Sequence, residues 1–194
     1  MYTIKKNSSS EPLKINIPSW EGFASKPEAT ACLSVTETGF KIAFTVFESD
    51  PKRVHTTHFS PVHTDSCVEW FVNFAPNVCD RYFNFEVNAA GAMNVAFRRD
   101  RYDFTPLTAE EVESFNITPV IYENHWEVSY EIPFSFIKKY IPGYEPKSGD
   151  IIKTNMYKCG DETAAPHYLA LFRVGHSEPD FHRPEYFGEM QIQL

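Results

Sequence analysis

The sequence has no long apolar run and no long basic run, and these two absences exclude several classes of protein. No apolar stretch approaches 18 residues, so no transmembrane helix is predicted. The longest basic runs are pairs, such as Arg98-Arg99 and Lys138-Lys139, in a chain of net charge −8. Because clustered lysine and arginine bind phosphate backbones and anionic lipid, we expect neither nucleic acid nor a membrane as a partner.

Several short motifs of metal binding and catalysis are also missing. The four cysteines form no Cys-x-x-Cys pair, which excludes a zinc ribbon. We expect free thiols, although a Cys67–Cys79 disulfide stays open for an oxidising compartment. The sequence contains no Gly-x-Ser-x-Gly elbow and no Gly-rich phosphate loop.

The first residues lack the apolar core of a signal peptide. We therefore expect a cytoplasmic protein if the chain is complete, and a secreted or periplasmic one if a signal peptide was removed. No stretch of the chain repeats another, and the loop-like run over residues 7–12 predicts a flexible N-terminal arm, residues 1–12, ahead of one domain over residues 13–194.

The aromatic content, 15% of the chain, together with 14 prolines favours strands over helices. Apolar and polar residues alternate over 30–48, 68–74, 82–88, 126–132 and 189–194, and more weakly over 92–98, 117–122, 150–157 and 167–174. Nine or ten strands with one apolar face each predict an all-β fold, an antiparallel β-sandwich of two packed sheets. One or two short helices are expected, the first opening at Thr108 with Glu111 in the capping-box position, the second after Pro133.

Polar residues along two neighbouring strands indicate a possible binding surface. Glu69 lies on the polar face of one strand, and Asn84, Glu86 and Asn88 lie on the polar face of the next. Carboxylates and amides can each contact neighbouring hydroxyls of a sugar, although an ordinary solvated sheet face explains the same pattern. Trp70 and Trp126 are expected in the core, while Trp20 either packs against the sandwich edge, which is favoured, or faces a ligand.

Three long segments without regular patterning, residues 49–66, 99–107 and 158–187, carry six of the seven histidines, and we expect them to build the site. Asp161 and Glu162, in a Gly-Asp-Glu-Thr run, are weak candidates for calcium. Glu69 and Glu86 are the obvious pair if the protein hydrolyses glycosides, because the separation of two catalytic carboxylates cannot be read from sequence.

The ordered motifs resemble those of family 9 carbohydrate-binding modules. Residues 65–72 (DSCVEWFV) are similar to the family's "D-S-x-V-E-x-F" strand, and residues 82–88 (YFNFEVN) with Gly91 resemble its next strand. Residues 126–134 (WEVSYEIPF) are similar to its "W-x-x-E-x-x-I-P-F" segment, and residues 181–188 (FHRPEYFG) resemble its closing run. The resemblance covers roughly residues 13–194.

The resemblance implies a sandwich related to the DOMON fold that binds an oligosaccharide or polysaccharide end without catalysis. No cofactor is then required, and structural calcium is possible. The family's glutamate matches Glu69 and its arginine falls near Arg98, with Arg99 as the alternative; its two slot aromatics fall at His63 and Phe172, where the best-known slot has tryptophans. The expected ligand-binding residues are therefore His63, Glu69, Asn88, Arg98, Tyr157 and Phe172.

A second hypothesis is the related haem-binding branch of the same fold. Haem iron needs axial ligands such as histidine and methionine. Met93, Met156 and His63 are the residues of this chain that we consider as sources. A glycan-active enzyme is a third and less favoured hypothesis.

Overall fold

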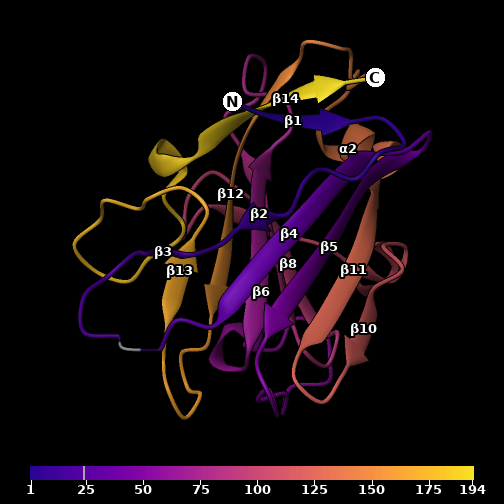
Figure 1. Ribbon diagram of the computed structural model, residues 1–194. Coiled ribbons are helices and arrows are strands. Elements are labelled where there is room, and N and C mark those ends of the chain that lie inside the picture. The colour runs from indigo at the N-terminus through magenta and orange to yellow at the C-terminus, as the bar shows by residue number, and fades with distance from the viewer. Residues whose placement is uncertain (24) are drawn as a thin grey trace.

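The computed structural model describes residues 1–23 and 25–194, and in it two β-sheets pack face to face (Figure 1). This confirms the predicted all-β sandwich. Among the described residues the larger sheet has nine strands: β1 (Tyr2–Lys5), β3 (Ile17–Pro18), β6 (Cys67–Asn73), β7 (Tyr82–Asn88), β8 (Met93–Arg98), β9 (Phe104–Pro106), β12 (Ile151–Cys159), β13 (Tyr168–Ala170) and β14 (Gly188–Gln193). Their order is β1-β14-β12-β6-β7-β8-β9, with β13 beside β12 and β3 beside β13.

The smaller sheet has five strands in the described part of the chain, in the order β10-β11-β5-β4-β2. These are β2 (Leu13–Lys14), β4 (Glu28–Val35), β5 (Gly39–Phe47), β10 (Thr118–Ile121) and β11 (Trp126–Pro133). Two α-helices, α1 (Ala109–Glu113) and α2 (Phe134–Tyr140), and two 3₁₀ turns, η1 (Val62–Thr64) and η2 (Pro184–Tyr186), complete the described elements. No helix among these residues has the length and apolar character needed to cross a membrane.

Two elements predicted from local sequence patterns, a hairpin and a capped helix, are present in the structure. β4 and β5 pair antiparallel as the hairpin expected over residues 30–48. Thr108 caps α1 by accepting from the Glu111 backbone N–H, and the Glu111 carboxylate accepts from the Thr108 backbone N–H. This reciprocal pair satisfies two backbone donors that a short helix would otherwise leave open.

The apolar faces of the two sheets form the core. Trp70 of β6 and Trp126 of β11 are both fully buried there, as predicted. The indole N–H of Trp70 donates to Thr154 Oγ1 at 2.8 Å, so the polar atom of this large side chain is satisfied inside the core. All four cysteines, Cys32, Cys67, Cys79 and Cys159, are free thiols.

The N-terminal residues differ from the expected loose arm. β1 pairs in parallel with β14 at the edge of the larger sheet, and Ile4 is 1% exposed in the core. Ile4 faces Ile192 in this register. A four-residue edge strand needs only one buried side chain, so its alternation is too short to be recognised in the sequence.

The outer face of the larger sheet is covered by other parts of the chain. From the sequence alone, an ordinary solvated face remained an alternative. Every residue of β7, and all but the last residue of β6, is buried. Irregular parts of the long segment between β12 and β14 contribute to this cover, because Phe181 joins Phe71 and Tyr157 in a second apolar cluster on this face. The site described below lies within this cover.

Candidate functional site

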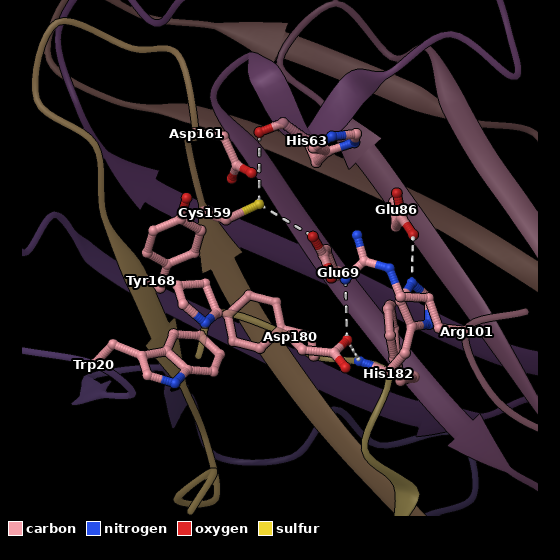
Figure 2. A pocket seen from close by; sticks show the side chains of 13 residues that line it. Trp20, His63, Glu69, Glu86, Arg101, Cys159, Asp161, Tyr168, Asp180 and His182 are labelled. Atoms are coloured by element: carbon pink, nitrogen blue, oxygen red, sulfur yellow. Dashed lines mark hydrogen bonds and ion pairs between the residues drawn. The ribbon is translucent and has the colours of Figure 1, made fainter. Parts of the chain in front are cut away.

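A pocket of about 130 Å³ opens on the outer face of the larger sheet (Figure 2). Its floor comes from three neighbouring strands: Glu69 and Phe71 of β6, Glu86 of β7 and Cys159 of β12. The three long unpatterned segments all supply lining residues, with His63 from the first, Arg101 from the second, and Asp161, Tyr168, Pro179, Asp180, Phe181 and His182 from the third. The prediction that these segments build a site is consistent with this pocket.

One wall of the pocket is aromatic. The ring centroid of Trp20 lies 5.2 Å from that of Phe181 and 5.6 Å from that of Tyr168. The Trp20 indole N–H donates to the His176 carbonyl at 2.8 Å, which fixes the ring. Behind this wall Tyr157 stacks on Phe181 with 3.9 Å between centroids. The wall therefore presents held ring faces, as stacking against a flat apolar ligand surface requires.

The opposite wall is polar and equally constrained. Arg101 pairs with Asp180 at 3.3 Å, and the same carboxylate accepts from the His182 backbone N–H at 3.0 Å. The Tyr82 hydroxyl contacts His182 Nδ1 at 3.0 Å. Burial, together with nearby Arg98, lowers the pKa of His182 to about 3. His182 is therefore a neutral ring near pH 7, able to donate one hydrogen bond and accept another.

Glu86 on the floor is held by two amides. Its carboxylate accepts from the side-chain amide of Asn84 at 2.7 Å and from that of Asn94 at 3.1 Å. β6 and β7 pair so that Glu86 lies directly opposite Glu69. The pocket thus has two carboxylates side by side on adjacent strands, one with fixed donors.

The Glu69 carboxylate has fewer hydrogen-bond donors around it than the Glu86 carboxylate. Its side chain is 3% exposed and accepts a hydrogen bond from the Cys159 thiol at 3.0 Å. No Lys, Arg or His in the described part of the chain forms an ion pair with it. Burial raises the pKa of Glu69 well above its usual value, and the neighbouring Cys159 and Glu86 add to the shift. Burial also raises the pKa of Asp161, which lines the same pocket.

Two of the sequence-predicted ligand residues, His63 and Glu69, line this pocket, and Arg98 does not. The Arg98 guanidinium donates to Asn84 Oδ1 at 2.8 Å and to the Arg101 carbonyl at 3.0 Å, and it lies over the Phe104 ring. These contacts support the loop that carries Arg101, so the arginine that reaches the pocket is three residues further along. The alternative, Arg99, pairs with Asp80 at the surface.

Asn88, Tyr157 and Phe172 also lie outside the pocket lining. The Asn88 amide donates to the His55 carbonyl and to the Asp65 carboxylate, so it joins loop and strand. Tyr157 is fully buried behind Phe181. Phe172 follows the end of β13, and its ring packs beside Gly188 and Tyr2 on the far side of β12. The alternation of apolar and polar residues predicts side-chain direction only within a strand. It therefore gives no direction for Phe172, which lies beyond the end of β13 at Ala170.

The two calcium candidates have different surroundings. Asp161 lines the pocket, with a hydrogen bond to Tyr168, whereas Glu162 is exposed and lies 3.6 Å from Lys52. Neither belongs to the one group of three or more His, Cys, Asp or Glu ligand atoms that converge among the described residues. Calcium binding at this pair stays a prediction without a convergent donor set to support it.

The candidate haem ligands lie on opposite faces of the larger sheet. Met93 and Met156 are fully buried in the core between the sheets. His63 lines the pocket on the outer face. Because the sheet separates the histidine from both methionines, they form no axial pair, and this arrangement gives the haem hypothesis no support.

The sequence analysis missed several lining residues. Phe181 enters the expectations only through the family's closing run, and His182 through that run and as one of the loop histidines. Arg101 is not among the expected residues, and Trp20 is expected to pack against the sandwich edge rather than to face a ligand. All four lie in irregular chain or beyond the last regular strand of their region, where no periodicity shows side-chain direction. The usable signal was the concentration of aromatic and charged residues in long unpatterned segments.

Residues 4–192 match the model of the family described as carbohydrate-binding family 9. Modules of this family are non-catalytic binding modules. No curated protein matches the chain.

Three solved structures share the fold. A proposed carbohydrate-binding protein from Bacteroides uniformis ATCC 8492 is 25% identical, with a TM-score of 0.84 over 94% of this chain and 86% of that one. A family 9 module from Caldicellulosiruptor kristjanssonii in complex with cellotriose is 12% identical, with a TM-score of 0.69 over 99% and 93% of the two chains. A family 9 module from the same organism in complex with glucose is 13% identical, with a TM-score of 0.65 over 94% and 84%.

Proposed function

The chain belongs to carbohydrate-binding family 9, and on that premise we propose that its outer-face pocket binds one neutral sugar unit at the end of a glycan, without catalysis. The observation that carries the proposal is the pairing of two unlike walls around one small pocket. Trp20 and Phe181 offer ring faces on one side, and Arg101, Asp180 and His182 offer donors and acceptors on the other. A sugar ring has apolar C–H faces and a hydroxyl rim, so it matches both walls.

The size of the pocket limits what can enter it. The pocket measures about 130 Å³, and a cavity of about 150 Å³ holds one benzene-sized molecule, which is smaller than a sugar ring with its hydroxyls. At most one sugar ring therefore enters this open pocket, and part of that ring and any further units of a chain lie outside its mouth. A larger hollow near Glu48 and Thr163 has no aromatic residue in its lining, which makes it a poorer candidate for sugar stacking.

The polar groups of the pocket are pre-organised by the protein. Glu86 is held by two amides, Asp180 by Arg101 and a backbone N–H, and His182 by Tyr82. Groups already fixed in place lose little conformational freedom when a ligand binds, so their hydrogen bonds contribute more to affinity. The two Caldicellulosiruptor modules are in complex with glucose and cellotriose, which makes gluco-configured sugars the first ligands to test.

Isothermal titration calorimetry with glucose, cellobiose and cellotriose tests the proposal. We expect Trp20→Ala and Arg101→Ala each to weaken binding at least about tenfold, or about 1.4 kcal/mol. Arg99→Ala is the matched control, because both arginine side chains are half exposed and each pairs with an aspartate, yet only Arg101 lines the pocket. Phe172→Ala separates this pocket from the slot expected from sequence and should leave affinity unchanged.

Three results would contradict the proposal or part of it. If Phe172→Ala weakens binding while Trp20→Ala does not, the sugar lies elsewhere on the sheet. If the parent protein binds none of the three sugars, nor any ligand of a broad glycan array, the pocket does not serve carbohydrate. Release of reducing sugar on incubation with glycans would contradict the non-catalytic part, and would direct attention to Glu69 and Glu86.

A further inference from the structure

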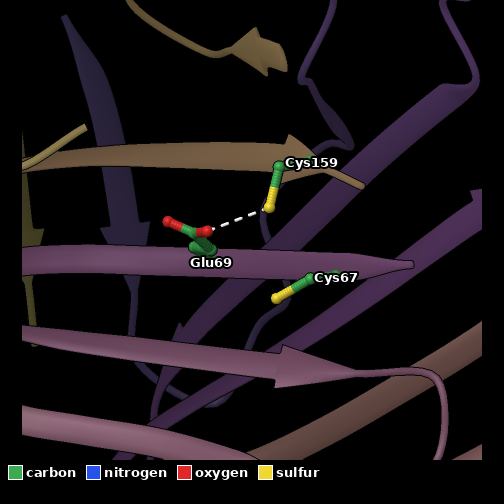
Figure 3. A group of neighbouring side chains, drawn as sticks. All are labelled: Cys67, Glu69 and Cys159. Carbon is green, nitrogen blue, oxygen red and sulfur yellow. Dashed lines mark hydrogen bonds between the residues drawn. The ribbon is translucent and has the colours of Figure 1, made fainter. Parts of the chain in front are cut away.

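We propose that the floor of the pocket is also a binding site for a thiophilic divalent cation of the zinc type, held by Cys67, Cys159 and Glu69 (Figure 3). One ligand atom from each residue lies within 4.8 Å of the other two, and all three residues are buried. In the described part of the chain no other group of three His, Cys, Asp or Glu side chains converges in this way.

The sheet itself brings these ligands together. Cys67 and Cys159 are direct partners in the antiparallel register of β6 and β12. Glu69 follows Cys67 by two residues on β6, so the strand period of two directs both side chains to the same face. Ligands carried by two paired strands are held more firmly than ligands on loops, as a pre-formed metal site requires.

The spacing suits a tetrahedral ion. Zinc–sulfur bonds are about 2.3 Å, which puts two sulfur ligands of a tetrahedral site about 3.8 Å apart. Rotation of the cysteine side chains is enough to reach that separation from ligand atoms within 4.8 Å of one another. Thiolate ligands select soft or borderline cations such as zinc over calcium and magnesium, which prefer oxygen.

Within the described part of the chain, the partners of these groups are weak or belong to the cluster itself. The Cys67 thiol lies a long 3.6 Å from the Val68 carbonyl and contacts Cys159, and the hydrogen bond that Glu69 accepts comes from the Cys159 thiol. A buried carboxylate without a cation is costly unless it carries a proton. A dication held by two thiolates would supply that charge at the place where Glu69 lies.

The pocket gives the ion a route and a further ligand. Cys159 and Glu69 line it directly, and Cys67 lies next to them on the same face. Because the cluster opens into the pocket, a water can take the fourth position. The site is separate from the sugar contacts of Trp20 and Arg101, and its test needs no sugar.

Cobalt serves as a spectroscopic probe for zinc in the reduced full-length chain after treatment with a chelator. We expect one equivalent of Co²⁺ to bind with a thiolate-to-cobalt charge-transfer band, and zinc to displace it. Cys32→Ser/Cys79→Ser is the matched control, because it removes the two partly exposed cysteines outside the cluster. It should bind like the parent, whereas Cys67→Ser/Cys159→Ser should lose the band and bind zinc at least about 100-fold more weakly.

Each of three results would overturn the site. The first is a parent complex without the charge-transfer band, which is decisive even if Cys67→Ser/Cys159→Ser fails to fold. The second is equal zinc affinity in all three proteins, which assigns binding to other residues. The third is displacement of zinc by millimolar calcium, which is incompatible with two thiolate ligands. Circular dichroism of each variant checks the fold, and sugar titrations on chelated protein keep the two proposals independent.

Discussion

Replacing Glu69 by glutamine should change how stability depends on pH more than any other substitution on the pocket floor. Glu69 is buried without a cation in the chelated protein, and its pKa is raised well above the usual value by that burial. A carboxyl with a raised folded pKa stabilises the fold fully below its unfolded pKa of about 4.3, and this contribution is lost as the pH rises towards the folded pKa. Glutamine has the shape of the neutral acid and does not titrate.

The expected magnitude follows from proton linkage. Within the window between the two pKa values, stability falls by about 1.4 kcal/mol per pH unit for one group. Between pH 5 and pH 6, above the unfolded pKa, the parent should therefore lose stability relative to Glu69→Gln, by at most about 1.4 kcal/mol. The sequence left an ordinary solvated face open at Glu69, whereas in the structure this residue is 3% exposed.

Urea titrations of both proteins at pH 5 and pH 6, with chelator present, measure this double difference. Glu131→Gln is the control, because Glu131 lies half exposed on β11 of the other sheet. It should follow the parent within about 0.5 kcal/mol at both pH values. Parallel pH profiles for the parent and Glu69→Gln would refute the reasoning, since they would mean that a protein group compensates the Glu69 charge.

Two further predictions concern the core and the polar wall. Trp70→Ala should destabilise the protein by about 3–5 kcal/mol in a urea titration, because it removes a fully buried indole and its hydrogen bond to Thr154. The control Tyr102→Ala, at an 87% exposed position, should change the stability by less than about 0.5 kcal/mol. Equal losses in the two variants would place the core elsewhere. Because the pKa of His182 is lowered to about 3, its contribution is present above the unfolded pKa of about 6.5 and is lost as the pH falls. His182→Gln should accordingly remove about 1.4 kcal/mol of acid destabilisation between pH 6 and pH 5, and a thermal-melt series in which both proteins lose stability equally would contradict the lowered pKa.

The strands that bury one face were readable because their period of two is a local property. The β4–β5 hairpin, the core positions of Trp70 and Trp126, and the capping box at Thr108 all follow from residues within a few positions of one another. The family motifs are of the same kind, and the match over residues 4–192 confirms the resemblance that they carried. The edge strand β1 was not predicted from the sequence, because only one of its residues is buried and so the strand shows no alternation.

The pocket depends on contacts between residues far apart in the chain, and only the tertiary structure decided it. Trp20 meets Phe181, and Cys67 meets Cys159, across separations that no local pattern encodes. The sequence alone determined a β-sandwich of the carbohydrate-binding type, the face that carries Glu69 and the three segments that cover it. Which arginine and which aromatic side chains line the pocket was decided by how the irregular chain beyond the strand ends packs back onto the sheet, because such chain has no periodicity to direct its side chains.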